Sequence, residues 1–152
     1  MIQRIQSVYL MLSLILVALM AWLPLGEIAT ASTIYSFNIR GVFNEQTAKM
    51  VVNGWPLLML LVIIELIHLF VIFGFKNRIL QMRMSTFNII LMVGIFVVCF
   101  VFVKMSLKSI GEGTYVFKIV MAFPFVAVIL NYLAIRAIAR DEALVRSIDR
   151  IR

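Results

Sequence analysis

Four long runs of apolar residues constrain the fold of this chain more than any other feature. They cover about residues 5–25, 55–75, 87–103 and 117–135. Each run is close to the ~20 residues that an α-helix needs to cross about 30 Å of hydrocarbon. Hydrophobic residues make up 64% of the chain and charged residues 14%, which is too apolar for a water-soluble domain. We therefore predict an all-α membrane protein with four transmembrane helices in one domain, residues 1–152.

The first run has an alternative interpretation as a cleaved signal peptide. It follows a short segment in which Arg4 is the charged side chain, and it precedes Ala29-Thr30-Ala31, which has the small-x-small pattern of a signal-peptidase site. The apolar region of a signal peptide is usually about 7–15 residues long, which is shorter than this run. We therefore expect the run to be retained as a membrane span.

The basic residues predict the orientation of the chain. They flank the apolar runs instead of forming one patch, which argues against nucleic-acid binding despite the net charge of +7. The segment 76–84 alone carries three of them and no acid, and short loops dominate the positive-inside rule. With the N-terminus inside, nine of the 14 basic residues are cytoplasmic: Arg4, Lys76, Arg78, Arg83, Arg136, Arg140, Arg146, Arg150 and Arg152. We therefore expect both termini in the cytoplasm.

Two segments on the opposite side carry weak strand signals. Residues 26–54 are rich in Ser, Thr and Asn, and within them Ile34–Arg40 alternates polar and apolar residues as a strand does. Thr114–Phe117 follows the turn signal Gly111-Glu112-Gly113. A small extracytoplasmic β-hairpin or sheet joining the two loops and a pair of irregular loops lying on the helix ends both fit this pattern.

The tail, residues 136–152, is predicted to continue the fourth helix into the cytoplasm because it contains no Gly or Pro. Its apolar residues fall mostly on one side of the helix. Arginines recur four residues apart on the other side, where Glu142 and Arg146 also share this spacing. An exposed apolar stripe favours a covering partner, although a solvated extension or a helix lying on lipid remains open. The residues expected to bind a partner are Arg136, Ile138, Arg140, Leu144, Val145, Arg146, Ile148 and Arg150.

Glu65 and His68 form a polar pair near the middle of the second run. They are three residues apart and therefore lie on one helical face. A charge at mid-bilayer costs about 2.5–3.5 kcal/mol, so we expect both groups to be neutral and to share a hydrogen bond that locks the helices together. A proton relay or solute site and a contact with a partner subunit are the alternatives. Asn88 and Asn131 are further candidates for hydrogen bonds between helices.

The sequence lacks the motifs of most enzymes. It contains no Walker loop, nucleophile elbow, zincin motif or dinucleotide fingerprint. The di-iron proteins that share a Glu-x-x-His motif need a second such motif and further carboxylates, which the other runs lack. His68 is the only histidine and Cys99 the only cysteine, so bis-histidine haem ligation and a cysteine zinc cluster are excluded within one chain. We expect no catalytic residue, no metal site and no cofactor.

Three segments of this chain carry a family resemblance. They are the opening Met1–Tyr9, the Leu23-Pro24 pair that closes the first run, and the ending Ala137–Arg152. Together they resemble a family of small four-span membrane proteins of unknown function from Bacteroidota, and the resemblance covers essentially the whole chain. It implies a location in the inner membrane of a Gram-negative cell, and it brings no activity or catalytic residues with it.

These observations favour a non-enzymatic accessory or scaffold subunit of a larger inner-membrane assembly. Its expected partners are the lipid bilayer and other membrane-protein subunits, and a homo-oligomer is also open. The alternative is a small transporter or channel component that uses Glu65 and His68 as a protonatable site within the membrane.

Overall fold

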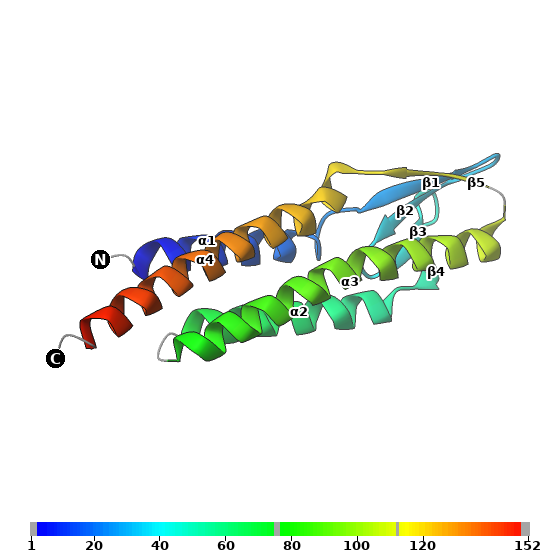
Figure 1. The fold of residues 1–152 in the computed structure, drawn as a ribbon. Helices are drawn as coiled ribbons and strands as arrows, with labels where there is room; N and C mark the ends of the chain where they lie inside the picture. Colours follow the sequence, from blue (N-terminus) through cyan, green and yellow to red (C-terminus); the bar gives the residue numbers. More distant parts are fainter. Residues whose placement is uncertain (1–2, 75–76, 112, 150–152) are drawn as a thin grey trace.

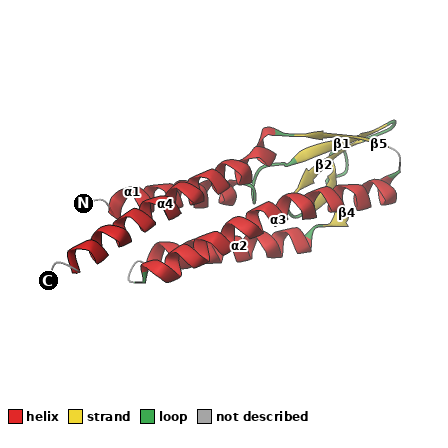
Figure 2. Ribbon diagram, viewed as in Figure 1, coloured by secondary structure: helices red, strands yellow, loops and turns green. Residues whose placement is uncertain are grey.

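The structure is a computed structural model that describes residues 3–74, 77–111 and 113–149. Within these residues the chain forms helices and one β-sheet (Figure 1; Figure 2). In chain order the elements are α1 (Gln3–Leu19), β1 (Gly26–Thr30), β2 (Ile34–Asn38), β3 (Gly41–Asn44), β4 (Met50–Asn53), α2 (Trp55–Phe73), α3 (Arg78–Ile110), β5 (Gly113–Phe117), the 3-10 helix η1 (Ile119–Ala122) and α4 (Phe123–Asp149).

The all-α prediction is wrong, because both loops that face away from the termini contribute strands to one sheet. The sheet has five strands in the order β4-β3-β2-β1-β5, and all neighbouring strands are antiparallel. The second loop supplies β5, which pairs with β1 from Gly26↔Phe117 to Thr30↔Gly113. Of the two alternatives for the loops, the structure therefore shows a sheet that joins them.

The prediction of four spans is also wrong. By length and composition, three helical segments of the described chain could cross a membrane: Trp55–Phe73, Arg78–Ile110 and Ile119–Val145. In contrast, α1 has 17 residues, and its apolar part Ile5–Leu19 is shorter than a span. Helix α1 ends at Leu19, and residues 20–22 continue in tight turns whose backbone N–H groups bond three residues back. Pro24 then disfavours helical geometry at Leu23, and the chain enters β1.

Two other predicted boundaries differ from the structure. Helix α3 has 33 residues, so it extends well beyond the predicted run 87–103 at both ends. The fourth predicted run begins at 117, but α4 begins at Phe123, and Pro124 therefore lies in its first turn, where a proline loses no intrahelical hydrogen bond. Beyond 135 the helix continues unbroken to Asp149.

The helices form one bundle, in which α1 packs against α2 and α4, and α3 packs against the same two helices. Figure 1 shows the sheet at one end of the bundle and both chain ends at the other. The C-terminal part of α3 reaches the sheet, where Phe102 stacks on Phe37 of β2 with ring centroids 5.7 Å apart. One apolar core cluster therefore runs from the sheet into the adjoining half of the bundle.

The outward faces of the bundle are apolar, as the exposed residues Leu66, Phe73 and Val97 illustrate. Trp22, which is 78% exposed, and Trp55 lie where the bundle meets the sheet, and Arg40 lies 5.7 Å over the Trp22 ring. Amphipathic rings gather at such levels in membrane interfaces. The three long apolar helices and these surfaces are compatible with a membrane protein.

Candidate functional site

The bundle contains a polar cluster built from one residue of each helix. His68 Nε2 on α2 lies 2.9 Å from Ser13 Oγ on α1 and 3.1 Å from Asn131 Nδ2 on α4. Asn131 Nδ2 donates to Ser13 Oγ at 2.5 Å and lies 3.9 Å from the sulfur of Met92 on α3. All four side chains are completely buried. We call Ser13, His68, Met92 and Asn131 the His68 cluster.

The carbonyl groups around the cluster fix its hydrogens. His68 Nδ1 lies 3.1 Å from the Ile64 carbonyl oxygen, which can only accept, so Nδ1 carries a proton. Asn131 Nδ2 lies 3.0 Å from the Ala127 carbonyl oxygen, and this contact sets the orientation of the amide. Because an amide nitrogen can only donate, His68 Nε2 is the acceptor in its contact with Asn131. The Ser13 hydroxyl also lies 3.2 Å from the Ala127 carbonyl oxygen, to which it can donate. The network therefore fits a neutral imidazole.

Each helix brings its member of the cluster inward through the same periodicity. The buried residues of α2 are spaced alternately by four and three: Leu57, Leu61, Ile64, His68 and Val71. On α3 and α4 the same spacing places Met92 and Asn131 on the buried faces, and such a seam keeps one helical face toward its neighbours. Ala127 and Ala134 flank Asn131 and are small enough to let the helices approach closely.

More polar residues are buried in the half of the bundle that is remote from the sheet. Gln6 of α1 donates to Asp141 of α4, and Gln81 of α3 donates to the Val71 carbonyl oxygen of α2 at 2.9 Å. Ser85 Oγ and both amide atoms of Asn88 are buried without a hydrogen-bond partner among the described residues. Apart from Ser106, the buried polar residues thus lie away from the sheet, beside a smaller apolar cluster of Leu10, Val71 and Ala134.

The predicted hydrogen bond between Glu65 and His68 is not among the bonds of the described residues. His68 bonds with Ser13, Asn131 and Ile64 instead. Glu65 follows Ile64 at the edge of the buried face and is half-buried, and its Oε1 has no hydrogen-bond partner in the described chain. The spacing of three residues places Glu65 and His68 on neighbouring turns of α2, but their side chains do not bond to each other.

The residues predicted to bind a partner divide into two groups. Ile138 is completely buried inside the bundle and is closed to an external partner, whereas Arg136 and Arg140 are exposed. Leu144 and Val145 are 54% and 41% exposed. The side chains of Arg146 and Ile148 and the whole of Arg150 lie outside the described residues. In the described part of the tail, the accessible large apolar side chains are therefore Leu144 and Val145.

Sequence reasoning found His68 and Asn131 but missed Ser13. The signal that could have revealed it is the spacing of Gln6 and Ser13, which are seven residues apart and therefore share one face of α1. Asn131 does bond across helices as expected. Asn88 was expected to do so as well, yet no such bond occurs in the part of the chain that the structure describes.

The distance between Ser13 and His68 matches that of a catalytic serine and its histidine base, but the groups around the pair differ from those of a catalytic site. A serine hydroxyl 2.9 Å from a histidine nitrogen is the spacing of a nucleophile and its base. Here Nδ1 bonds to a carbonyl oxygen of its own helix, no carboxylate of the described residues bonds to the ring, and every member of the cluster is buried. No group of three metal-ligating side chains occurs within residues 3–74, 77–111 and 113–149. The geometry favours a lock between helices.

The comparisons with known proteins give one finding. Residues 2–151 match the model of a family described as a domain of unknown function, DUF4293. No curated protein and no solved structure matches the chain. The resemblance to a family of unknown function is thereby confirmed.

Proposed function

We propose that this chain, which belongs to the DUF4293 family of unknown function, is a non-enzymatic accessory subunit of a larger assembly in a bacterial inner membrane. The observation that carries the proposal is the C-terminal part of α4. Its last turns project beyond the first turn of α3 (Figure 1), and they leave Leu144 and Val145 exposed beyond the packed bundle. An apolar surface beside arginines on a projecting helix suits a protein partner.

The proposed placement in the membrane follows from helix lengths and basic residues. Helix α2 has 19 residues and a rise of about 28 Å, which matches the hydrocarbon thickness between Trp55 at its start and Phe73 at its end. The end of the bundle that carries the chain ends also carries Arg78, Arg83 and Arg136. Under the positive-inside rule, we place this end in the cytoplasm and the sheet outside it.

The His68 cluster supports a structural role for the bundle core. Hydrogen bonds between membrane helices stabilise a bundle by about 0.6 kcal/mol each on average, and Asn131 alone bonds to two other helices. A core held in this way presents a rigid surface to a partner without chemistry of its own.

Replacing the exposed apolar residues of the tail tests the proposal. The tagged protein is solubilised in mild detergent, and we expect stoichiometric subunits to co-purify with it. The double variant Leu144→Asp, Val145→Asp should lose these subunits and stay folded, because it removes the exposed apolar surface and leaves the bundle untouched. The readout is the composition of the purified complex.

The matched control is Ala143→Asp, Ser147→Asp. It adds the same two charges at exposed positions of the same helix without removing large apolar side chains, so it should keep the partners. Recovery of the protein alone from several detergents, or an unchanged composition after Leu144→Asp, Val145→Asp, would count against docking through the tail.

A second candidate function is a small transporter or channel component, which the buried unpaired polar atoms favour. Glu65 Oε1, Ser85 Oγ and the Asn88 amide are closed off from solvent without a hydrogen-bond partner in the described chain, and water or a polar solute passing between the helices would satisfy them. Flux of protons or solutes into liposomes should then fall after Glu65→Gln. Equal flux with and without the carboxylate would exclude Glu65 as a gate.

A further inference from the structure

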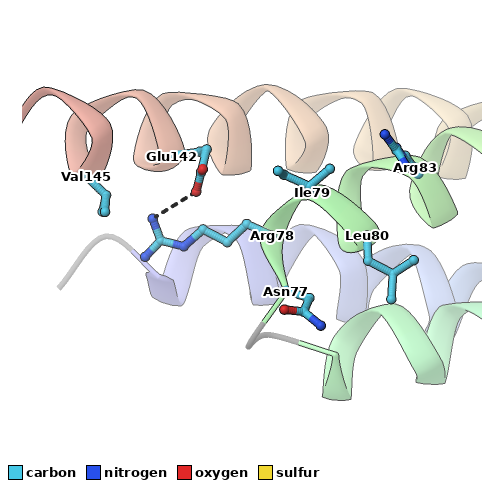
Figure 3. Close-up of a pocket in the computed structure, with 7 residues that line it drawn as sticks. All are labelled: Asn77, Arg78, Ile79, Leu80, Arg83, Glu142 and Val145. Atoms are coloured by element: carbon cyan, nitrogen blue, oxygen red, sulfur yellow. Dashed lines mark ion pairs between the residues drawn. The ribbon is translucent and has the colours of Figure 1, made fainter. Parts of the chain in front are cut away.

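We propose that a cavity between the start of α3 and the end of α4 binds the headgroup phosphate of an anionic phospholipid. The cavity has a volume of about 530 Å³. Figure 3 shows the two sides: Arg78, Ile79, Leu80 and Arg83 come from the first turns of α3, and Glu142 and Val145 come from α4. The cavity shares Val145 with the exposed apolar surface of the tail, but its charged residues, Arg78, Arg83 and Glu142, lie outside that surface.

Arg78 lines the cavity with an unused donor. Its Nη1 lies 4.0 Å from Glu142 Oε2, which is within ion-pair range but too long for a hydrogen bond. The same nitrogen is buried and has no acceptor in the described part of the chain. A buried donor of this kind costs free energy until an acceptor reaches it. Phosphate oxygens are the acceptors that the guanidinium fork fits best.

The charges of the lining fit a singly charged anion. The described lining contains two arginines, Arg78 and Arg83, and one carboxylate, Glu142, so it carries one net positive charge. Arg78 is also the first residue of α3, where the helix dipole adds partial positive charge. A headgroup with one net negative charge balances this set, whereas a zwitterionic choline headgroup does not.

The apolar part of the lining and its level in the bundle point to a lipid. Ile79, Leu80 and Val145 are partly exposed at the cavity and offer a surface to the glycerol and upper acyl region. Helix α2 spans one hydrocarbon thickness and ends at Phe73, and α3 begins five residues later. The cavity therefore lies at the headgroup level on the side away from the sheet, where basic pockets between helices bind anionic lipids.

Native mass spectrometry of the full chain in detergent tests the site, with phosphatidylglycerol and phosphatidylcholine as probes. We expect phosphatidylglycerol to bind at least about tenfold more tightly, as electrostatic recognition of one extra charge allows. Arg78→Gln, Arg83→Gln should remove this preference and leave phosphatidylcholine binding unchanged. The control Lys104→Gln, Lys108→Gln removes two exposed charges from the other end of α3 and should keep the preference.

Glu142→Gln provides a test that does not depend on losing the arginines. It removes the carboxylate that repels the anion, so phosphatidylglycerol should bind about threefold more tightly and phosphatidylcholine as before. A preference that survives in Arg78→Gln, Arg83→Gln, that disappears equally in the lysine control, or that fails to rise in Glu142→Gln would overturn the site. Displacement of phosphatidylglycerol by an equal concentration of inorganic phosphate would overturn the lipid as its occupant.

Discussion

Asn131 connects three helices through one amide nitrogen. Nδ2 lies within hydrogen-bond distance of Ser13 Oγ, His68 Nε2 and the Ala127 carbonyl oxygen of its own helix, and these three acceptors share its two hydrogens. In Asn131→Leu both interhelical contacts of the amide are lost, while Ser13 and His68 keep their contact with each other and with the Ala127 and Ile64 carbonyl oxygens. We expect the free energy of unfolding to fall by about 1–2 kcal/mol, the sum of two such bonds in a membrane bundle. Reversible unfolding in mixed detergent micelles measures it.

Asn88→Leu is the control for this prediction. Asn88 is completely buried like Asn131, but neither of its amide atoms has a partner in the described residues. Replacing an unpaired buried amide by an apolar side chain of similar size should be neutral or stabilising. A larger loss of stability in Asn88→Leu than in Asn131→Leu would show that the hydrogen bonds of the His68 cluster do not hold the bundle.

At the residue scale, the sequence shows which polar side chains cost free energy when they are buried, but it does not show their hydrogen-bond partners. His68 and Asn131 stand out because polar side chains are rare in apolar runs. The serine that completes the cluster is unremarkable in a membrane helix, so Ser13 gave no separate signal. In the sequence, Glu65 was the most evident partner for His68. The helical turn of α2, however, places the Glu65 carboxylate at the edge of the buried face on which His68 lies.

At the scale of elements, the long apolar helices could be predicted, whereas the sheet was one of two alternatives for the loops. The β1–β5 pair joins Gly26 to Phe117, and no local pattern encodes a pairing so distant in sequence. The strands have only four or five residues each, so their alternation is too short to identify all of them. The long flanks of α3 were missed because polar residues such as Gln81 and Ser85 interrupt its apolar run.

The glycine at the start of β3, Gly41, allows β3 and β4 to approach each other closely. Gly41 has φ +141°, which L side chains rarely adopt. A Cβ there would collide with the Val52 carbonyl oxygen of β4 and lie 2.9 Å from the Gly54 nitrogen. We expect Gly41→Ala to cost at least about 1 kcal/mol and to lower the melting temperature in detergent.

Gly94→Ala is the matched control, because nothing lies within 4 Å of a Cβ added there in the middle of α3. It should stabilise the helix by up to about 1 kcal/mol. If both substitutions shifted the melting temperature in the same direction, the tight approach of β3 to β4 would not be what limits stability.

At the scale of the whole molecule, composition and the apolar runs predicted a membrane-compatible bundle, but not the number of its long helices. The first run resembles a span because apolar residues continue past Leu19, where α1 ends, as far as Leu23. No residue at Leu19 marks the end of the helix, and the helix-disfavouring Pro24 comes several residues later. The arrangement of the bundle, with the sheet at one end and the chain ends at the other, depends on contacts between helices that a single sequence does not show.

The central claim is that the bundle crosses a bilayer, with the sheet outside and the end of α4 in the cytoplasm. Cys99 is completely buried, so it contributes little background to labelling by a thiol reagent. Ser32 in the β1–β2 turn and Ser147 on α4 are both exposed. In spheroplasts, a membrane-impermeant maleimide should label Ser32→Cys directly and Ser147→Cys only after the membrane is broken. Equal labelling of both variants in sealed spheroplasts, or the reverse order, would contradict the proposed placement of the protein in the membrane.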